Sequence, residues 1–349
     1  MAKARVDGLI ITNSLTGGGA ERAMNIVSNS LHSLGIPIAL VPINRSENDL
    51  IDLKCEVLGL NRDWGGGFFS VLHSWFKLQR IILRLKPRYL VLNCDLPELL
   101  GSFSLLGPKL VVVEHASRPW PAKKIFGQLI RQILKFRAAY WVAVSENLQI
   151  WGLNLKPDCV IQNPIHLTTK IELFNKVQAK QLDFKKRLVF IGRLNEVKQP
   201  NWVLELAGKV NLPCVVIGGG PLEQSLKTFA ISSKIESNFL GHVKDAWENL
   251  TENDLLLIPS KNEGDGLVIV EAIANQVPFL LLRVPDLERF KLPDNYYCSD
   301  INEFEVKVRL YFSNMLNLSL PANYRNAILE SRNPEIIGNQ WRVLLSKLR

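Results

Sequence analysis

The chain alternates short apolar runs with longer segments whose apolar residues recur every three or four positions. The short runs, rich in branched residues, predict strands, and the amphipathic segments predict helices. In the first half we predict strands at 8–12, 38–42, 89–93, 110–114 and 140–144, and helices at 20–34, 71–85, 124–137 and 146–152. Strands that alternate with helices in this way indicate a parallel sheet covered on both faces.

The same pattern starts again after a charged segment, from Lys170 to Lys186, that we interpret as a connection between domains. The second half predicts strands at 187–192, 214–218, 238–240, 255–259 and 279–282, helices at 202–209, 222–232 and 267–275, and a last helix near 334–347. We therefore predict an α/β protein with two Rossmann-like, doubly wound domains that face a central cleft. The domains span residues 1–164 and 165–333, and the C-terminal helix, 334–349, packs back toward the N-terminal domain.

Composition narrows the class of protein. A chain of 349 residues, 47% of them hydrophobic, is long and apolar enough to form two hydrophobic cores. No apolar run approaches the ~20 residues of a membrane span, and we expect no signal peptide. Five scattered cysteines without C-x-x-C spacing argue against disulfides and zinc and suit a reducing cytosol. The net charge of +9 favours an anionic partner, but it does not indicate whether that partner is nucleic acid, a membrane surface or a phosphorylated ligand.

Two glutamates, Glu263 and Glu271, flank a turn between a predicted strand and a predicted helix. Gly264 and Gly266 allow a tight turn, and the helix starts near Leu267. A helix start after such a turn presents unpaired backbone N–H groups, which suit an anionic diphosphate. Glu263 could then contact a sugar and Glu271 a ribose hydroxyl, which is the chemistry of a nucleotide-sugar pocket.

Glycine-rich turns also follow two other predicted strands, at 17–19 and at 218–220. Both let a ligand approach the backbone and turn a helix N-terminus toward negative charge. A purely structural turn explains either segment as well, and the spacing is not the G-x-G-x-x-G of dinucleotide sites. The glycines that we assign to the site are Gly18, Gly19, Gly219 and Gly220.

Three polar side chains follow predicted strands, at the edge where open α/β sheets bind ligands. His115 could donate a hydrogen bond to a sugar hydroxyl; the alternative is a histidine satisfied by loop backbone. Arg193 and Lys198 could stabilise a departing nucleoside diphosphate; the alternative is a pair of solvated loop charges. The other four histidines, among them His242, lack such a position, and we treat them as structural or surface residues.

Taken together, these motifs resemble the family 4 glycosyltransferases, retaining enzymes with the GT-B fold, over almost the whole chain. The matching segments are Gly18-Gly19-Ala20-Glu21-Arg22, His115, Asn163-Pro164-Ile165, Gly192-Arg193-Leu194 with Lys198, Gly218-Gly219-Gly220-Pro221-Leu222, Leu240-Gly241-His242-Val243, and Glu263 with Glu271. Each segment alone is modest support, whereas their order and spacing together are specific.

The resemblance implies transfer of a sugar, with retained configuration, from a nucleotide sugar, which we expect to be a UDP- or GDP-sugar. As acceptor we expect a lipid-linked or cell-surface glycan precursor, as in lipopolysaccharide or other polysaccharide synthesis. It implies catalytic roles for His115, Arg193, Lys198 and Glu263, and donor-binding roles for Gly18, Gly19, Gly219, Gly220, Gly264, Asp265, Gly266, Leu267 and Glu271. It implies an acceptor-side domain at 1–164 and a nucleotide-sugar-binding domain at 165–333. No cofactor or metal is expected, and the chain has no Asp-x-Asp element.

The chain departs from the family pattern near the proposed site. Asp265 stands where an aromatic residue is frequent, Ala116 follows His115 where Asp is common, and Gln199 follows Lys198 where Gly is usual. Asn275-Gln276 also stands where a Gly usually precedes the next strand. These departures leave the donor sugar open, but none removes a proposed charged contact, so we expect an active enzyme.

Two stretches, 67–88 and 118–137, mix Phe and Trp with basic residues and contain no acidic residue. Basic amphipathic helices of this kind suit an anionic bilayer surface; the alternative is that the apolar residues face the core. On the membrane interpretation the protein lies peripherally on the cytoplasmic face. The basic residues assigned to this surface include Lys77, Arg80, Lys124, Arg131 and Lys135.

Three other functions share part of this pattern. A nucleotide-sugar epimerase of the GT-B type has the same two-domain architecture, and it would not depend on an acceptor. A non-catalytic, glycosyltransferase-like scaffold subunit would not need the charged residues. Nucleic-acid binding rests on net charge alone, and we expect no nucleic-acid partner because no binding motif supports it.

Overall fold

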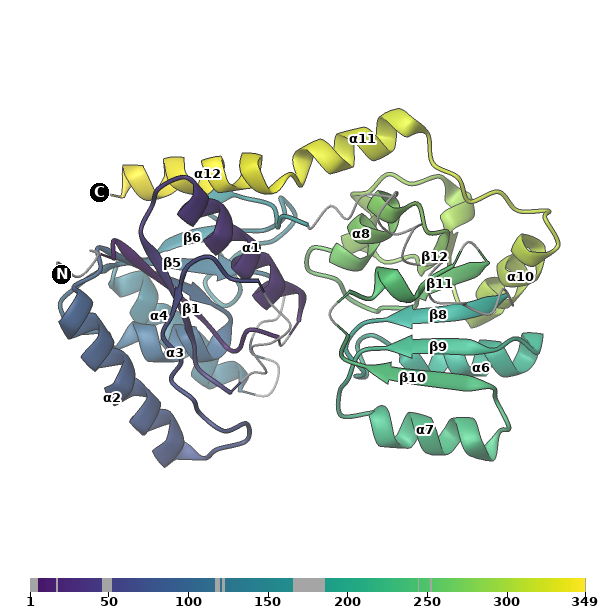
Figure 1. The fold of residues 1–349 in the computed structure, drawn as a ribbon, viewed down its shortest axis with the longest axis horizontal. Helices are drawn as coiled ribbons and strands as arrows, with labels where there is room; N and C mark the ends of the chain where they lie inside the picture. Colours follow the sequence, from purple (N-terminus) through teal and green to yellow (C-terminus); the bar gives the residue numbers. More distant parts are fainter. Residues whose placement is uncertain are drawn as a thin grey trace. The chain divides into compact units, whose positions relative to one another are not determined.

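The computed structural model describes residues 6–16, 18–45, 52–116, 120, 123–165, 186–243, 245–251 and 253–348. The chain divides into two compact units (Figure 1). The first contains Met1–His166 and Glu330–Arg349, and the second contains Leu167–Leu329. The charged connection expected from Lys170 onward lies outside the described residues as far as 185.

The first unit is built on a seven-stranded parallel sheet with the order β3-β2-β1-β4-β5-β6-β7. Its strands are β1 (Gly8–Thr12), β2 (Ile38–Pro42), β3 (Glu56–Val57), β4 (Tyr89–Asn93), β5 (Lys109–Glu114), β6 (Tyr140–Ala143) and β7 (Cys159–Val160). The central strands are buried along their whole length, which is expected of a parallel sheet covered on both faces.

Helices cover both faces of this sheet (Figure 1). α1 (Gly19–Ser33) and α12 (Pro334–Lys347) pack on one face, where Trp341 joins the same apolar cluster as Ile10 of β1. The neighbours of Ile10 along β1 point the other way, into a second cluster with the other three helices. These are α2 (Phe68–Leu85), α3 (Asp95–Ser102) and α4 (Lys124–Phe136).

The second unit contains a six-stranded parallel sheet with the order β10-β9-β8-β11-β12-β13. Its strands are β8 (Arg187–Ile191), β9 (Cys214–Ile217), β10 (Ser237–Gly241), β11 (Asp254–Ile258), β12 (Phe279–Leu282) and β13 (Tyr297–Cys298). Its helices are α6 (Pro200–Val210), α7 (Glu223–Ser232), α8 (Leu267–Asn275), α9 (Pro285–Glu288) and α10 (Ile301–Phe312), with the 3-10 turns η2 (Trp247–Asn249) and η3 (Asp294–Tyr296). α11 (Ala322–Ser331) leads back to the first unit.

These two sheets confirm the predicted class of two doubly wound α/β domains. The helix predicted over 146–152 is wrong, because this segment forms turns and an isolated antiparallel bridge between Ile150 and Leu155. Its backbone bonds elsewhere: the Trp151 N–H donates to Glu114 Oε2 (3.4 Å), and the Trp151 carbonyl accepts from Arg131 (3.1 Å). Such bonds replace the internal pairs that a helix would make.

Candidate functional site

The strand order of the second sheet reverses between β8 and β11, which are neighbours. From β8 the chain continues to β9 and β10 on one side, and from β11 to β12 and β13 on the other. Loops that leave the carboxyl ends of two such strands diverge and open a crevice, where ligands of open α/β sheets bind. Lys198 lies in the segment after β8, and Glu263 lies in the loop after β11.

The structure brings Lys198 and Glu263 together at this edge. Lys198 Nζ lies 2.5 Å from Glu263 Oε1, and the two side chains are 26% and 11% exposed. The Lys198 N–H donates to Asn195 Oδ1 (3.1 Å), and Lys261 N donates to the Val197 carbonyl (2.9 Å), which ties the two loops. Because the pair is partly exposed, an anionic ligand can reach the ammonium group and compete with Glu263 for it.

The loops after β8 and β9 are in close contact. A Cβ at Gly218, whose φ is +125°, would lie 2.0 Å from the Gly192 carbonyl oxygen. A Cβ at Gly220 would lie 2.4 Å from the Leu194 carbonyl oxygen. The structural interpretation of this glycine turn therefore holds, since only glycine lets these backbones meet.

Gly219 and Arg193 occupy the same edge of the sheet. A Cβ at Gly219 would lie 2.8 Å from Nε2 of His242, which follows β10. Our sequence reasoning gave His242 no role, although its place after a strand is the signal that singled out His115. Arg193 directly follows Gly192 and is exposed, so solvent and ligands can reach its side chain.

Glu271 lies in α8 and is buried, with 5% of its surface exposed. Its Oε2 accepts a hydrogen bond from Trp247 Nε1 (3.2 Å), and Trp247 is itself buried. α8 begins at Leu267 after Gly266, whose φ of +61° is the left-handed conformation that favours glycine. The Glu271 carboxylate is thus held in one place by an indole that no spacing in the sequence identified.

The turn before α8 is held by Arg289, which follows α9. Arg289 Nη1 donates to the Gly264 carbonyl (2.8 Å), and Nη2 lies 3.8 Å from Asp265 Oδ1. Asp265 is buried beside this guanidinium. Arg289 was not predicted, because its contact depends on how the segment after α9 folds back on the turn.

In the first unit, His115 lies at the carboxyl end of β5. Its Nε2 is 2.5 Å from Asn93 Oδ1, at the end of the neighbouring strand β4. Burial lowers the pKa of His115 to about 4, so the ring is neutral at pH 7. The Asn93 amide nitrogen lies 3.4 Å from both Thr12 Oγ1 and the Ala20 carbonyl, which assigns Oδ1 to the histidine. Nε2 then carries the proton and donates to Asn93, so Nδ1 can only accept a hydrogen bond, whereas from the sequence we expected His115 to donate one to a sugar hydroxyl.

Gly18 and Gly19 are exposed at the start of α1 in the first unit. Gly18 precedes the helix, and its carbonyl accepts from the Arg22 N–H (3.0 Å) in the first turn. The first N–H groups of a helix have no partner within it. This end of α1 therefore presents donors next to the carboxyl end of β1.

A buried ionic cluster lies directly behind His115. Arg131 of α4 is fully buried between Glu98 of α3, at 2.6 Å, and Glu114 of β5, at 2.5 Å. Trp120 Nε1 also donates to Glu98 Oε2 (2.9 Å). Burial raises the pKa of Glu114 to about 7, although Arg131 opposes that shift. Assigning Arg131 to a basic membrane-facing surface was therefore wrong, because its guanidinium is needed in the core by two carboxylates.

The described part of the chain offers neither a metal cluster nor a membrane-spanning helix. It holds no group of three or more His, Cys, Asp and Glu side chains placed to bind a metal ion. Within the same residues, every helix is too short or too polar to cross a bilayer.

The chain is similar to proteins described as glycosyltransferases. Residues 173–288 match the family model described as glycosyl transferases group 1, a span that includes Lys198, Glu263 and Glu271. A Campylobacter jejuni protein is 24% identical over 283 residues, 76% of each chain, and is named GalNAc-alpha-(1->4)-GalNAc-alpha-(1->3)-diNAcBac-PP-undecaprenol alpha-1,4-N-acetyl-D-galactosaminyltransferase. An uncharacterized glycosyltransferase of Haemophilus influenzae is 24% identical over 291 residues, which cover 78% of this chain and 79% of its own.

Solved structures share the architecture at low sequence identity. Anabaena HepE in complex with UDP and glucose superposes with a TM-score of 0.76 at 14% identity, covering 98% of this chain and 99% of its own. Sucrose-phosphate synthase from Thermosynechococcus elongatus superposes with a TM-score of 0.77 at 14% identity, covering 98% of each chain. The chain therefore has the two-domain, parallel-sheet GT-B fold of these proteins.

Proposed function

We propose that this protein is a glycosyltransferase that uses a nucleotide-sugar donor. The observation that carries the proposal is the Lys198–Glu263 pair at the point where the strand order of the second sheet reverses. This pair lies within the span that matches the group 1 glycosyl transferase model. The presence of UDP and glucose in the Anabaena HepE structure supports a donor of this kind.

In this proposal the second unit binds the donor, a UDP- or GDP-sugar. Lys198 and the exposed Arg193 bind the diphosphate and stabilise the charge that develops on it as the sugar departs. The start of α8, from Gly264 to Leu267, presents its N–H groups to the same phosphates. Glu263, released from Lys198 by the diphosphate, contacts the donor sugar, and the buried Glu271 carboxylate contacts the ribose.

We propose family 4 chemistry, in which the configuration of the transferred sugar is retained and no metal is required. Protein cations and helix N–H groups supply the positive charge that a metal would otherwise provide. The neutral His115 ring accepts a hydrogen bond from a sugar hydroxyl through Nδ1, while Nε2 stays with Asn93. Gly18 and Gly19 lie at the start of α1, where donor phosphate or acceptor would meet the first N–H groups of the helix.

We propose a lipid-linked glycan precursor as the acceptor, and a peripheral position on the cytoplasmic face of an anionic membrane. The printed name of the Campylobacter relative includes PP-undecaprenol, which supports an acceptor of this class. In this chain, α2 and α4 expose apolar side chains among basic ones and contain no acidic residue. The exposed apolar residues on these helices are Phe68, Phe69, Leu72, Phe76, Leu83, Ile125, Phe126, Leu129 and Phe136.

The donor assignment is tested by a thermal-shift screen against UDP, GDP and their sugars. A ligand that binds only the folded protein raises its melting temperature, by an amount that grows with its concentration over its Kd. We expect a shift with one nucleoside diphosphate and its sugar, and a smaller one in Lys198→Ala. Absence of any shift at millimolar nucleotide would overturn the donor site.

Release of nucleoside diphosphate separates transfer from the alternatives. We expect release to accelerate when a lipid-linked saccharide is added to the donor. Acceptor-independent conversion of the donor would indicate an epimerase. Donor binding with no turnover under any acceptor would indicate a non-catalytic scaffold subunit.

A further inference from the structure

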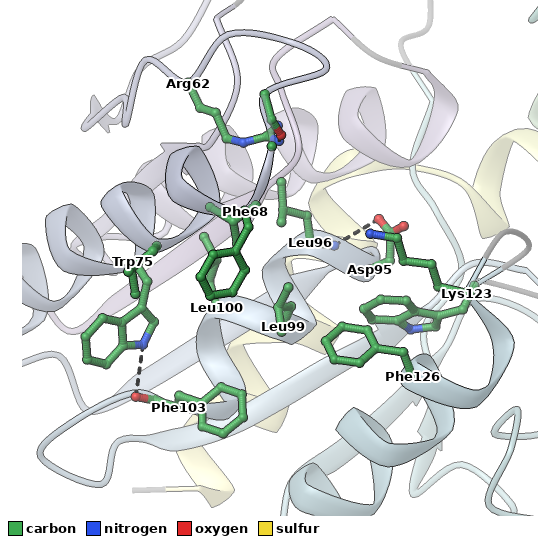
Figure 2. A pocket seen from close by; sticks show the side chains of 15 residues that line it. Arg62, Phe68, Trp75, Asp95, Leu96, Leu99, Leu100, Phe103, Lys123 and Phe126 are labelled. Carbon is green, nitrogen blue, oxygen red and sulfur yellow. Dashed lines mark hydrogen bonds between the residues drawn. The ribbon is translucent and has the colours of Figure 1, made fainter.

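A large apolar cavity lies in the first unit (Figure 2). Its volume is about 710 Å³, within the range typical of small-molecule sites. Side chains of α2, including Val71 and Trp75, form one wall, and α3 supplies Leu96 and Leu99. Phe126 of α4 closes it on another side. A space so lined favours a hydrocarbon over a sugar, because sugar hydroxyls would lose their hydrogen bonds to water.

Hydrogen bonds hold two of the wall residues, Trp75 and Trp120, in place. Trp75 Nε1 donates to the Phe103 carbonyl (3.2 Å; Figure 2), which joins α2 to the segment after α3. Trp120, another wall residue, donates to the buried Glu98. A Cβ at Gly127 would lie 2.3 Å from the Trp120 ring, so glycine lets this ring lie against α4. The cavity is therefore built into the fold rather than left by loose packing.

One end of the cavity carries charge. Asp95 and Lys123 line this end: in Figure 2 they lie with Phe126 toward one side of the view, and Trp75 and Phe103 lie toward the other. A second cation, Arg62, lines the cavity near the top of the view. Arg62 is held by Asn44 Oδ1 (2.7 Å) and the Gly66 carbonyl. Lys123 is exposed just before α4. With two cations and one carboxylate, the lining of the cavity as a whole is net positive, which suits an apolar molecule with an anionic head.

The charged end lies at the functional edge of the sheet. Asp95 comes two residues after Asn93, the partner of His115. Asn13, after β1, donates to Asp95 Oδ1 (3.4 Å), so the loops after β1 and β4 meet here. The cavity also reaches the exposed apolar surface, because Phe68, Leu72 and Phe103 both line it and are exposed.

We propose that this cavity binds the hydrocarbon chain of the lipid-linked acceptor, next to its phosphate group. The chain passes from the exposed apolar surface between α2 and α3, and Lys123 contacts the phosphate at the charged end. The acceptor's sugar is thereby delivered to the edge that carries Asn93 and His115. This inference rests on the proposed function, since it assigns the lipid of that acceptor a place in the protein.

Photolabelling of the full chain with farnesyl phosphate that carries a diazirine on its hydrocarbon tests the site directly. We expect labelled peptides from 68–75, 96–103 and 123–126, with labelling reduced by unlabelled farnesyl phosphate but not by inorganic phosphate. Phosphatidylglycerol with a diazirine in its acyl chain should instead label exposed residues such as Phe69 and Ile125. Farnesyl labelling elsewhere, or equal labelling of the cavity by phosphatidylglycerol, would overturn the proposal.

A pair of tryptophan substitutions on one helix provides the control. Val71→Trp fills the cavity and should lower farnesyl phosphate labelling at least tenfold. Leu83→Trp changes an exposed residue of α2 that does not line the cavity, and it should leave labelling unchanged. Equal labelling of both variants contradicts the proposal. If Val71→Trp does not fold, the competition by unlabelled farnesyl phosphate on the unchanged protein tests the proposal instead.

The donor thermal shift separates this inference from the proposed function. A nucleotide shift that persists in Val71→Trp, together with lost labelling, supports both. Specific labelling of the cavity without any nucleotide binding would overturn the transferase function and leave only a lipid site. Nucleotide-dependent transfer without labelling of the cavity would overturn the lipid site alone.

Discussion

Lys198 and Glu263 are each other's charged partners, across two loops of the second sheet. A diphosphate that binds Lys198 competes with Glu263, because the ammonium group cannot make its best contact with both anions. Donor binding would then free the Glu263 carboxylate to face the sugar. In the proposed function, the pair would couple phosphate recognition to sugar recognition through a single cation.

We expect Lys198→Ala to lower the rate of sugar transfer by roughly 100-fold or more, the usual effect of removing one group that stabilises a transition state. Lys198→Arg should restore little, since a planar guanidinium differs from a compact ammonium. Lys261→Ala removes an exposed lysine of the neighbouring loop and should retain the rate. Transfer rates at saturating donor check this, and an unchanged rate in Lys198→Ala would remove the site assignment.

His115 leads to a prediction about pH. Its pKa in the folded protein, about 4, lies below the ordinary 6.5, so the unfolded chain binds more protons between these values. The free energy of unfolding should therefore fall as the pH falls from 6.5 to 4, and this contribution should be intact above pH 6.5. NMR titration, with His115→Gln to assign the signal, measures the pKa; a midpoint near 6.5 would contradict a buried neutral ring.

Sequence reasoning could identify only part of this site. Lys198, Glu263 and His115 were recognisable because each follows an apolar strand of a predicted parallel sheet. Arg289 and Trp247 have no such signal: their contacts depend on distances that only the fold creates. Asn93 ends a predicted strand, as the residue before His115 does, but we did not select it from the sequence. The glycines at 218–220 show a further limit, because the same residues suit a ligand contact and a loop contact.

At the scale of elements, Arg131 joins α3, β5 and α4 behind His115. We expect Arg131→Met to destabilise the first unit by about 3–5 kcal/mol, because two carboxylates remain buried without their cation. Arg137 directly follows α4 and donates hydrogen bonds to the Gly101 and Ser102 carbonyls. Arg137→Met loses these bonds and should lower the free energy of unfolding by only about 1 kcal/mol.

Thermal unfolding measures this difference. A loss of 1 kcal/mol lowers the Tm of a domain of this size by roughly 2–4 °C, so the two variants should be separated by several degrees. A triple variant, Arg131→Met with Glu98→Gln and Glu114→Gln, should recover part of the loss, since no charge is left unpaired. Equal melting of Arg131→Met and the unchanged protein would show that the cluster does not stabilise the fold.

The elements themselves were largely predictable, since buried parallel strands read as continuous apolar runs. The exceptions have physical causes. Residues 146–152 have the composition of a helix, but Trp151 bonds to Glu114 and Arg131 instead. α3 was not predicted, because Pro97 lies within only eight residues and proline usually interrupts a helical pattern. The edge strands β3 and β7 have two residues each and leave no periodic signal.

At the scale of the whole molecule, part of the positive charge behind the net +9 lies on α2 and α4. α2 and α4 carry basic residues with no acidic ones, beside the exposed Phe and Ile side chains of the same helices. We define these two helices as the basic apolar surface. An exposed apolar surface among cations is costly in water, and it suits an anionic bilayer.

We expect the protein to bind phosphatidylglycerol vesicles at low salt and to be released as salt rises, because screening weakens each basic contact of about 1 kcal/mol. Ile125→Ser should weaken binding about tenfold, since a largely exposed isoleucine would lose roughly 1.5 kcal/mol of burial in lipid. Ile231→Ser is the matched control: Ile125 is 84% exposed on the basic apolar surface, and Ile231 is 79% exposed in the second unit. Vesicle sedimentation measures both, and equal weakening by the two changes, or no binding at any salt, would mean that this surface does not meet the membrane.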